Sequence, residues 1–167
     1  MKYVVLYQSK TGNTKQLAER IFREIKSEEK ELIDIDLSAT VPEADVYFIG
    51  FGVRSSFCSM DILDAIEKIQ NGAVAFFATC GCFPIEQYKY MIERKISLWL
   101  ANEVNYLGMF LCQGKVEEYR KKILLEENSN YKKELEQMFE RGNNHPDAED
   151  LTAAAEFVQT IIARMNA

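Results

Sequence analysis

An unusual density of hydrogen-bonding side chains lies near the start of the chain. A short apolar run is followed, directly before a segment of helical periodicity, by Ser9, Lys10, Thr11, Gly12, Asn13 and Thr14. A helix N-terminus presents unpaired backbone N–H groups and the positive end of its dipole, and added hydroxyl and amide donors suit such a turn to a phosphate group. The simpler interpretation is ordinary helix capping, which needs one or two of these side chains rather than four. We therefore predict a phosphate-binding turn.

The residues of this turn exclude several other loops of similar position. A dinucleotide-binding turn needs three spaced glycines, and only Gly12 is present. A nucleoside triphosphate loop needs Gly-Lys-Ser or Gly-Lys-Thr at the helix start, and a phosphatase loop needs a cysteine nucleophile. Residues 9–14 contain neither. A receiver domain needs acidic residues at the end of the first strand to hold a divalent metal, whereas Gln8 and Ser9 stand there.

Thiols and one histidine are the remaining candidates for chemistry. Cys80-Gly81-Cys82 could be a redox dithiol, half of a metal site, or small residues that line a pocket, and we expect the last. A soft-metal site needs two more thiolates, and Cys58 and Cys112 are single residues elsewhere in the chain, so no metal site is predicted. His145 precedes a proline, and we expect a solvated histidine in a turn.

Apolar runs and helical spacings alternate along the chain in the order typical of an α/β protein. Continuous apolar runs predict strands that are buried on both faces. We expect strands at 4–7, 32–37, 45–50, 73–78 and 106–112, and helices that include 17–25, 62–69 and 84–99, with Pro84 in the first turn of the third helix. Strands that alternate with helices form a parallel sheet with right-handed crossovers.

The last third of the chain is less regular. Residues 115–141 are highly charged and contain a modest apolar stripe, and 151–165 has the spacing of a final helix. We find no repeat or linker, so residues 1–167 are expected to form a single domain with a charged helical insertion at about 115–145. We expect this insertion to pack on the sheet edge, and the alternative is a docking module.

Composition limits the classes of partner. Twenty basic and 26 acidic residues give a net charge of -6. Binding to a nucleic-acid backbone needs a basic stripe, which the sequence lacks, whereas an acidic surface favours basic protein partners. No apolar run approaches the ~20 residues needed to span a membrane, and residues 1–10 lack the features of a secretory signal. We therefore expect no nucleic acid or membrane partner, and a cytoplasmic protein with reduced thiols.

The turn and the order of the elements resemble those of flavodoxins. Residues 9–14 match the Ser/Thr-x-Thr-Gly-Asn-Thr motif with which that family binds the 5′-phosphate of FMN. The resemblance covers the whole chain. It implies a flavodoxin-like, doubly wound, five-stranded parallel sheet of order 2-1-3-4-5 with helices on both faces. Residues 112–115 and His145-Pro146 also resemble a flavodoxin-like subfamily associated with bilin reduction in some gut bacteria, although residues 52–56 replace its usual Trp-Val-Asp-Lys-Gly.

The resemblance implies FMN as the cofactor, held by the turn at residues 9–14 and by two further loops. Carried over by position, these loops contribute Phe51, Gly52, Val53, Arg54, Thr79, Cys80, Gly81, Cys82 and Phe83. Phe51, Phe57 and Phe83 are candidates for flat walls against the flavin ring, and the alternative for each is core or loop packing. Glycines at 52 and 81 would allow the backbone to approach the ring.

The function that the resemblance implies is electron transfer through bound FMN, from a reductase to an acceptor enzyme. Two alternatives remain open. One is an FMN-dependent reductase that acts directly on a quinone or bilin-type substrate. The other is a flavin-free module that binds a partner. The oligomeric state is not predicted.

Overall fold

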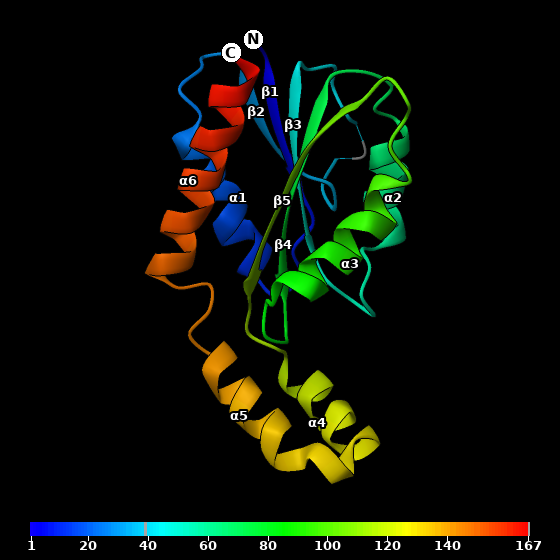
Figure 1. Ribbon diagram of the computed structural model, residues 1–167, viewed down its shortest axis with the longest axis vertical. Helices are drawn as coiled ribbons and strands as arrows, with labels where there is room; N and C mark the ends of the chain where they lie inside the picture. Colours follow the sequence, from blue (N-terminus) through cyan, green and yellow to red (C-terminus); the bar gives the residue numbers. More distant parts are fainter. Residues whose placement is uncertain (39, 167) are drawn as a thin grey trace.

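The computed structural model describes residues 1–38 and 40–166, which form one five-stranded parallel sheet with helices on both faces (Figure 1). The strand order is β2-β1-β3-β4-β5. The strands are β1 (Tyr3–Tyr7), β2 (Lys30–Asp34), β3 (Val46–Gly52), β4 (Ala73–Cys80) and β5 (Asn105–Gln113). The expected flavodoxin-like fold and strand order are confirmed.

The helices divide between the two faces because the strands are apolar on both. α1 (Asn13–Glu24) and α6 (Ala148–Met165) pack together on one face, and α2 (Met60–Glu67) and α3 (Glu86–Ser97) cover the other (Figure 1). Along β1, Val5 packs in the cluster of buried residues on the α1 and α6 face, whereas Val4 and Leu6 pack in the cluster on the α2 and α3 face. Each face therefore has its own core.

The second strand ends earlier than the sequence predicts. β2 stops at Asp34, and residues 35–37 form a turn in place of the expected strand end. The Asp34 carboxylate accepts a hydrogen bond from the Asp36 N–H at 3.1 Å. The backbone carbonyl oxygen of Asp34 accepts one from the Leu37 N–H at 3.0 Å. An aspartate that bonds to the backbone two residues ahead favours a turn over continued pairing. The third helix also begins later than expected, since Pro84 precedes α3 instead of lying in its first turn.

The charged segment is a helical hairpin. α4 (Glu118–Glu127), the short 3-10 helix η1 (Ser129–Tyr131) and α5 (Lys132–Gly142) project beyond the carboxyl ends of the strands (Figure 1). The expectation that this insertion packs on the sheet edge is therefore wrong. The Lys115 N–H donates to the His145 carbonyl oxygen at 3.1 Å, so the two ends of the insertion meet at its base. In residues 1–38 and 40–166, no helix is both long and apolar enough to cross a membrane.

Candidate functional site

A cavity of about 610 Å³ lies between the carboxyl end of the sheet and the helical hairpin. Its walls come from the loops after β1, β3, β4 and β5 and from the hairpin itself. Of the residues predicted to hold a cofactor, the structure brings these to the cavity: Lys10, Thr11, Asn13, Thr14, Gly52, Val53, Arg54, Thr79, Cys80, Gly81 and Cys82. The volume lies within the usual range for sites that bind small organic molecules.

The turn at residues 9–14 leaves the helix end uncapped and one buried hydroxyl group without a partner. Gly12 is the N-cap residue of α1, with a φ of 86°, and it has no side chain that could cap the helix. Ser9 and Gly12 do not line the cavity, but the Ser9 Oγ is the one buried side-chain oxygen or nitrogen in the described residues that lacks a hydrogen-bond partner. Ordinary capping, the simpler interpretation of this motif, therefore does not explain its hydroxyl groups. The donor set and the open helix end fit a phosphate group.

Two buried residues of this turn connect it to neighbouring loops. The Thr14 and Thr79 hydroxyl groups share a hydrogen bond of 3.0 Å, which joins the start of α1 to the end of β4. The Asn13 side-chain amide donates to the Lys115 carbonyl oxygen at 2.9 Å. A Cβ at Gly114 would lie only 2.8 Å from that amide nitrogen, so the small residue permits the close approach. These contacts fix the turn against the base of the hairpin.

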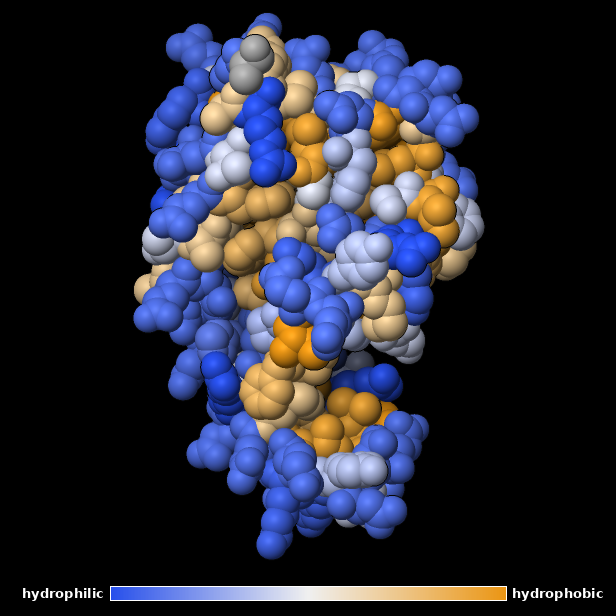
Figure 2. Space-filling model, viewed as in Figure 1, coloured by the Kyte–Doolittle hydropathy of each residue, from blue (hydrophilic) through white to orange (hydrophobic). Residues whose placement is uncertain are grey.

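The hairpin supplies an apolar wall. The apolar side chains that it contributes to the cavity are Leu124, Leu135, Met138 and Phe139. In Figure 2, apolar side chains gather over the region of α4 and α5, beside a hollow between the hairpin and the rest of the molecule. The Gln113 side chain ties α5 to the sheet, since its amide donates to the Met138 carbonyl oxygen at 3.0 Å. The cavity is thus polar at the turn and apolar at the hairpin.

The charge of the cavity differs in sign from that of the chain. Its charged lining residues are the basic Lys10, Arg54, Lys115 and Arg120 and the acidic Glu117, whereas the chain carries a net charge of -6. A concave site lined mainly by cations attracts anionic ligands. This distribution agrees with the donor-rich turn, because both favour an anion.

The thiols at the end of β4 share a hydrogen-bond network. The Cys80 thiol donates to the Cys82 carbonyl oxygen at 3.2 Å and lies 3.6 Å from the Cys112 carbonyl oxygen. Hydrogen bonds from Cys80 and Tyr88 lower the pKa of the Cys82 thiol to about 7, against the opposing effect of burial. The interaction of the Cys80 side chain with the Cys82 side chain, together with burial, raises the pKa of the Cys80 thiol. All four cysteines are free.

Comparison with known proteins identifies the family. The model of a family described as the flavodoxin domain matches residues 4–159. The chain belongs to the flavodoxin domain family.

Two relatives match nearly the whole chain. It is 30% identical to the flavodoxin-like domain-containing protein BilS of Clostridioides difficile (strain CD3), over 98% of both chains. It is 25% identical to the protein of that name from Clostridium symbiosum (strain WAL-14163), over 95% of this chain and 94% of the relative. Among solved structures, oxidised flavodoxin 2 from Bacillus cereus has a TM-score of 0.60 at 15% identity, over 98% of this chain and 99% of that one. The last comparison concerns the fold alone.

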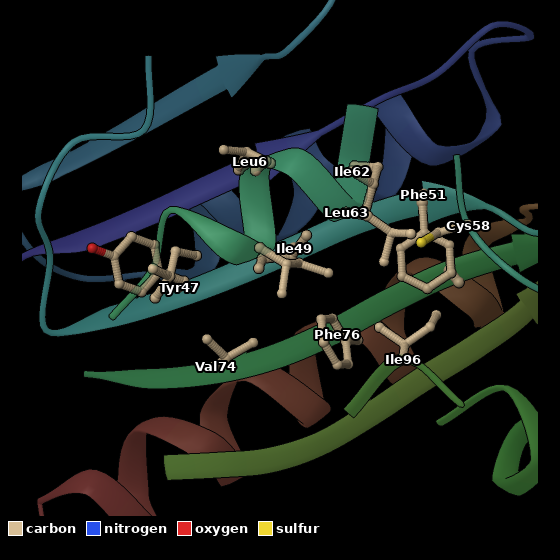
Figure 3. Packing of buried hydrophobic residues seen from close by; sticks show 14 of the residues in the cluster. Leu6, Tyr47, Ile49, Phe51, Cys58, Ile62, Leu63, Val74, Phe76 and Ile96 are labelled. Carbon is tan, nitrogen blue, oxygen red and sulfur yellow. The ribbon is translucent and has the colours of Figure 1, made fainter. Parts of the chain in front are cut away.

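In this flavodoxin-family chain, the aromatic rings expected to form flat walls lie elsewhere. Phe51 is 1% exposed and packs edge-on against Phe76, with ring centroids 6.2 Å apart (Figure 3). Its ring therefore belongs to the core, because β3 continues to Gly52 and Phe51 shares a face with Ile49. Phe57 packs against the same core cluster, and Phe83 lies under the Arg141 guanidinium, 5.2 Å from ring centroid to carbon. None of the three lines the cavity.

Other aromatic residues line the cavity instead. Tyr88 comes from α3, and Tyr119 and Phe139 come from the hairpin. Tyr88 has the spacing of the apolar face of α3, and Phe139 lies in the apolar stripe of the charged segment, both of which are ordinary patterns of core packing. For Tyr119 and Phe139, the position of the hairpin is what brings the ring to the cavity.

The end of β1 is organised by Gln8. Its side-chain amide donates to the Asp36 carboxylate at 2.7 Å and to the Asp61 carboxylate at 2.8 Å, and its oxygen accepts from the Ser59 hydroxyl at 2.5 Å. Asp61 therefore faces Gln8 rather than Arg54. Arg54 is exposed, lines the cavity and makes no ion pair within the described residues.

His145 is packed rather than solvated, which corrects the expectation for this residue. Its Nδ1 lies 2.5 Å from the Asp150 carboxylate and 3.8 Å from that of Asp147. Ligand atoms of these three residues lie within 4.8 Å of one another. Both carboxylates, however, accept N–H hydrogen bonds in the capping box of α6. The group therefore has a complete structural role at the hairpin base.

Proposed function

We propose that this chain binds FMN in the cavity and carries electrons from a reductase to an acceptor enzyme. The observation that carries the proposal is the donor-rich turn at 9–14, which borders the cavity and begins α1 without a side-chain cap. Bound FMN would supply the one- and two-electron chemistry, and the chain would supply its binding and orientation. The basic cavity lining supports a phosphate-bearing ligand, and the acidic exterior supports steering of basic protein partners.

The test compares FMN with riboflavin, which lacks the phosphate. Thr11 is exposed at the cavity wall and belongs to the turn. Removing one donor to a charged group costs about 1.5–3 kcal/mol, which corresponds to about ten- to hundredfold in affinity. Thr11→Ala should therefore weaken FMN binding by at least tenfold and leave riboflavin binding nearly unchanged, as measured by flavin fluorescence titration.

A matched control is Thr160→Ala on α6, where the hydroxyl donates to the Glu156 carbonyl oxygen of its own helix. This variant should bind both flavins like the parent protein. Equal losses for FMN and riboflavin in Thr11→Ala would place the phosphate elsewhere. Failure of the parent protein to bind either flavin would favour the flavin-free partner-binding module.

A second candidate is an FMN-dependent reductase that acts on a small conjugated molecule of quinone or bilin type. The apolar hairpin wall favours it, because Leu135, Met138 and Phe139 face the same cavity as the turn. A wall of this kind suits a flat apolar substrate next to the flavin. Saturable reduction of a small quinone by the isolated protein would distinguish this function from protein-to-protein electron transfer.

A further inference from the structure

Two thiols at the carboxyl end of β4 face the cavity and have unequal surroundings. Cys80 is 3% exposed, and Cys82 is partly exposed on the bend that follows the strand. Both line the cavity, whereas Cys58 and Cys112 are buried and do not. The pair is thus separated from the other thiols by its access to the cavity.

The hydrogen bonds around the pair assign a different role to each sulfur. Cys82 is the more exposed of the two thiols, and interactions with the Cys80 and Tyr88 side chains lower its pKa, which favours the thiolate. Cys80 remains protonated, since burial and its bond to Cys82 raise its pKa. The arrangement therefore holds a nucleophilic sulfur next to a thiol that can attack it after it has reacted.

The backbone between the two residues allows a disulfide. An extended step of two residues spans at most about 6.6–7.2 Å, and a bend shortens it. The chain bends at Gly81 and Cys82. Disulfide-bonded residues have Cα atoms roughly 4.4–6.8 Å apart, so the bend brings the two Cα atoms toward the range that a disulfide needs.

We propose that Cys82 and Cys80 form a reactive dithiol site whose substrates are low-molecular-weight disulfides that enter the cavity. The Cys82 thiolate attacks one sulfur of the small disulfide, whose S–S bond breaks, and one small thiolate leaves. Cys80 then loses its proton and attacks the Cys82 sulfur, which releases the second small thiol and closes the Cys80–Cys82 bond. The Cys80 and Cys82 thiols together lose two electrons and two protons, and the small disulfide gains them.

The ionisable groups that face the same cavity as Cys82 come from several elements. Cys80 faces it from β4, and Tyr88 faces it from α3. The charged residues of the same cavity wall are Lys10 and Lys115 near the turn, Arg54 after β3, and Glu117 and Arg120 at the start of α4. The two hydrogen-bond donors distinguish Cys82 from an ordinary exposed cysteine, whose pKa is about 8.5.

The first experiment incubates the reduced full-length chain with oxidised glutathione under anaerobic conditions, followed by acid quenching and mass spectrometry. The parent protein should lose two hydrogen atoms, retain no glutathione and yield a peptide linked through Cys80 and Cys82. Cys80→Ala should instead keep one glutathionyl group on Cys82. Cys58→Ala, the matched control, should behave like the parent protein. A stable glutathionyl adduct on parental Cys82, or reaction at Cys58 or Cys112, would overturn the proposal.

The second experiment follows the rate of iodoacetamide labelling of Cys82 against pH. The midpoint should lie near pH 7 in the parent protein and move to higher pH in Cys80→Ala and in Tyr88→Phe, because each change removes one donor. A parental midpoint at or above pH 8.5, or midpoints that the two substitutions leave in place, would contradict the assigned roles. Neither experiment depends on flavin, so a negative result here leaves the FMN titration to be judged separately.

Discussion

The Asn13 side-chain amide donates a hydrogen bond to the Lys115 carbonyl oxygen, with 2.9 Å between nitrogen and oxygen. Asn13 is the first residue of α1, and Lys115 lies between β5 and the hairpin. The bond therefore joins the predicted phosphate turn to the base of the element that roofs the cavity. A ligand that orders the turn should also order the hairpin.

Loss of this bond should loosen the hairpin. Asn13→Ala removes a buried donor, and a hydrogen bond of this kind contributes about 0.5–1.5 kcal/mol. We expect a fall of about 1 kcal/mol in the free energy of unfolding and faster proteolysis within residues 116–144. Urea denaturation and limited proteolysis measure the two effects.

The control for this prediction is Gln159→Ala, which removes a hydrogen bond of 2.6 Å from the Gln159 side-chain amide on α6 to the Glu24 carboxylate on α1. It should leave cleavage of the hairpin at the parental rate. Equal proteolysis of both variants would show that the Asn13 contact does not restrain the hairpin.

Ser9→Ala should affect stability and binding in opposite directions. The Ser9 Oγ is buried without a partner, and an unsatisfied buried polar group costs about 1–3 kcal/mol. Without flavin, the variant should therefore be at least as stable as the parent protein in urea denaturation. Its affinity for FMN should fall, because this unpaired hydroxyl belongs to the turn that is proposed to hold the phosphate.

Ser59→Ala provides the contrast, since that hydroxyl caps α2 and donates to Gln8. Loss of a cap of this kind typically costs about 1 kcal/mol. If Ser9→Ala instead loses as much stability as Ser59→Ala and keeps full FMN affinity, the hydroxyl serves the fold rather than a ligand.

The sequence predicts the sheet well because its apolar runs are continuous and end at turn residues. The order β2-β1-β3-β4-β5 follows from the resemblance carried by residues 9–14, and the structure confirms it. The same pattern does not reveal that β3 extends to Gly52, and this extension is what places the Phe51 ring in the core. The end of β3 is set by its pairing with β4, in which Gly52 lies opposite Thr79.

The cavity could be predicted only in part. The turn at 9–14 follows β1, and residues 79–82 span the end of β4 and the bend after it. Both lie at the carboxyl edge of the sheet, so their convergence is expected from the fold. The stripe of Leu135, Met138 and Phe139 has ordinary helical spacing, which does not specify the surface that it faces. That surface is set by contacts distant in sequence, including the bonds from Asn13 to Lys115 and from Gln113 to Met138.

Arg54→Gln should lower the potential at which bound flavin is reduced. Reduction adds negative charge to the flavin, and an unpaired cation at the cavity wall favours the reduced form. An exposed charge interacts by about 1 kcal/mol or less, which for one electron corresponds to a shift of roughly 40 mV. Spectroelectrochemical titration at low and high salt should show a downshift that shrinks as salt screens the field. An unchanged potential would show that the Arg54 charge does not act on the flavin.

Replacement of the hairpin distinguishes the two candidate functions. The Lys115 N–H donates to the His145 carbonyl oxygen at 3.1 Å, so these two residues are neighbours. A short Gly-Ser linker can therefore replace residues 116–144 and keep Lys115 next to His145. For an electron carrier, the reduced variant should pass electrons to cytochrome c at least as fast as the parent protein, because the roof over the cavity is gone. Parental reduction of menadione should rise linearly with its concentration. The double variant Leu135→Ser/Met138→Ser retains the hairpin but removes part of its apolar wall, and it should match the parent protein with both acceptors. Saturable menadione reduction that disappears in both variants would instead establish the hairpin wall as a substrate site.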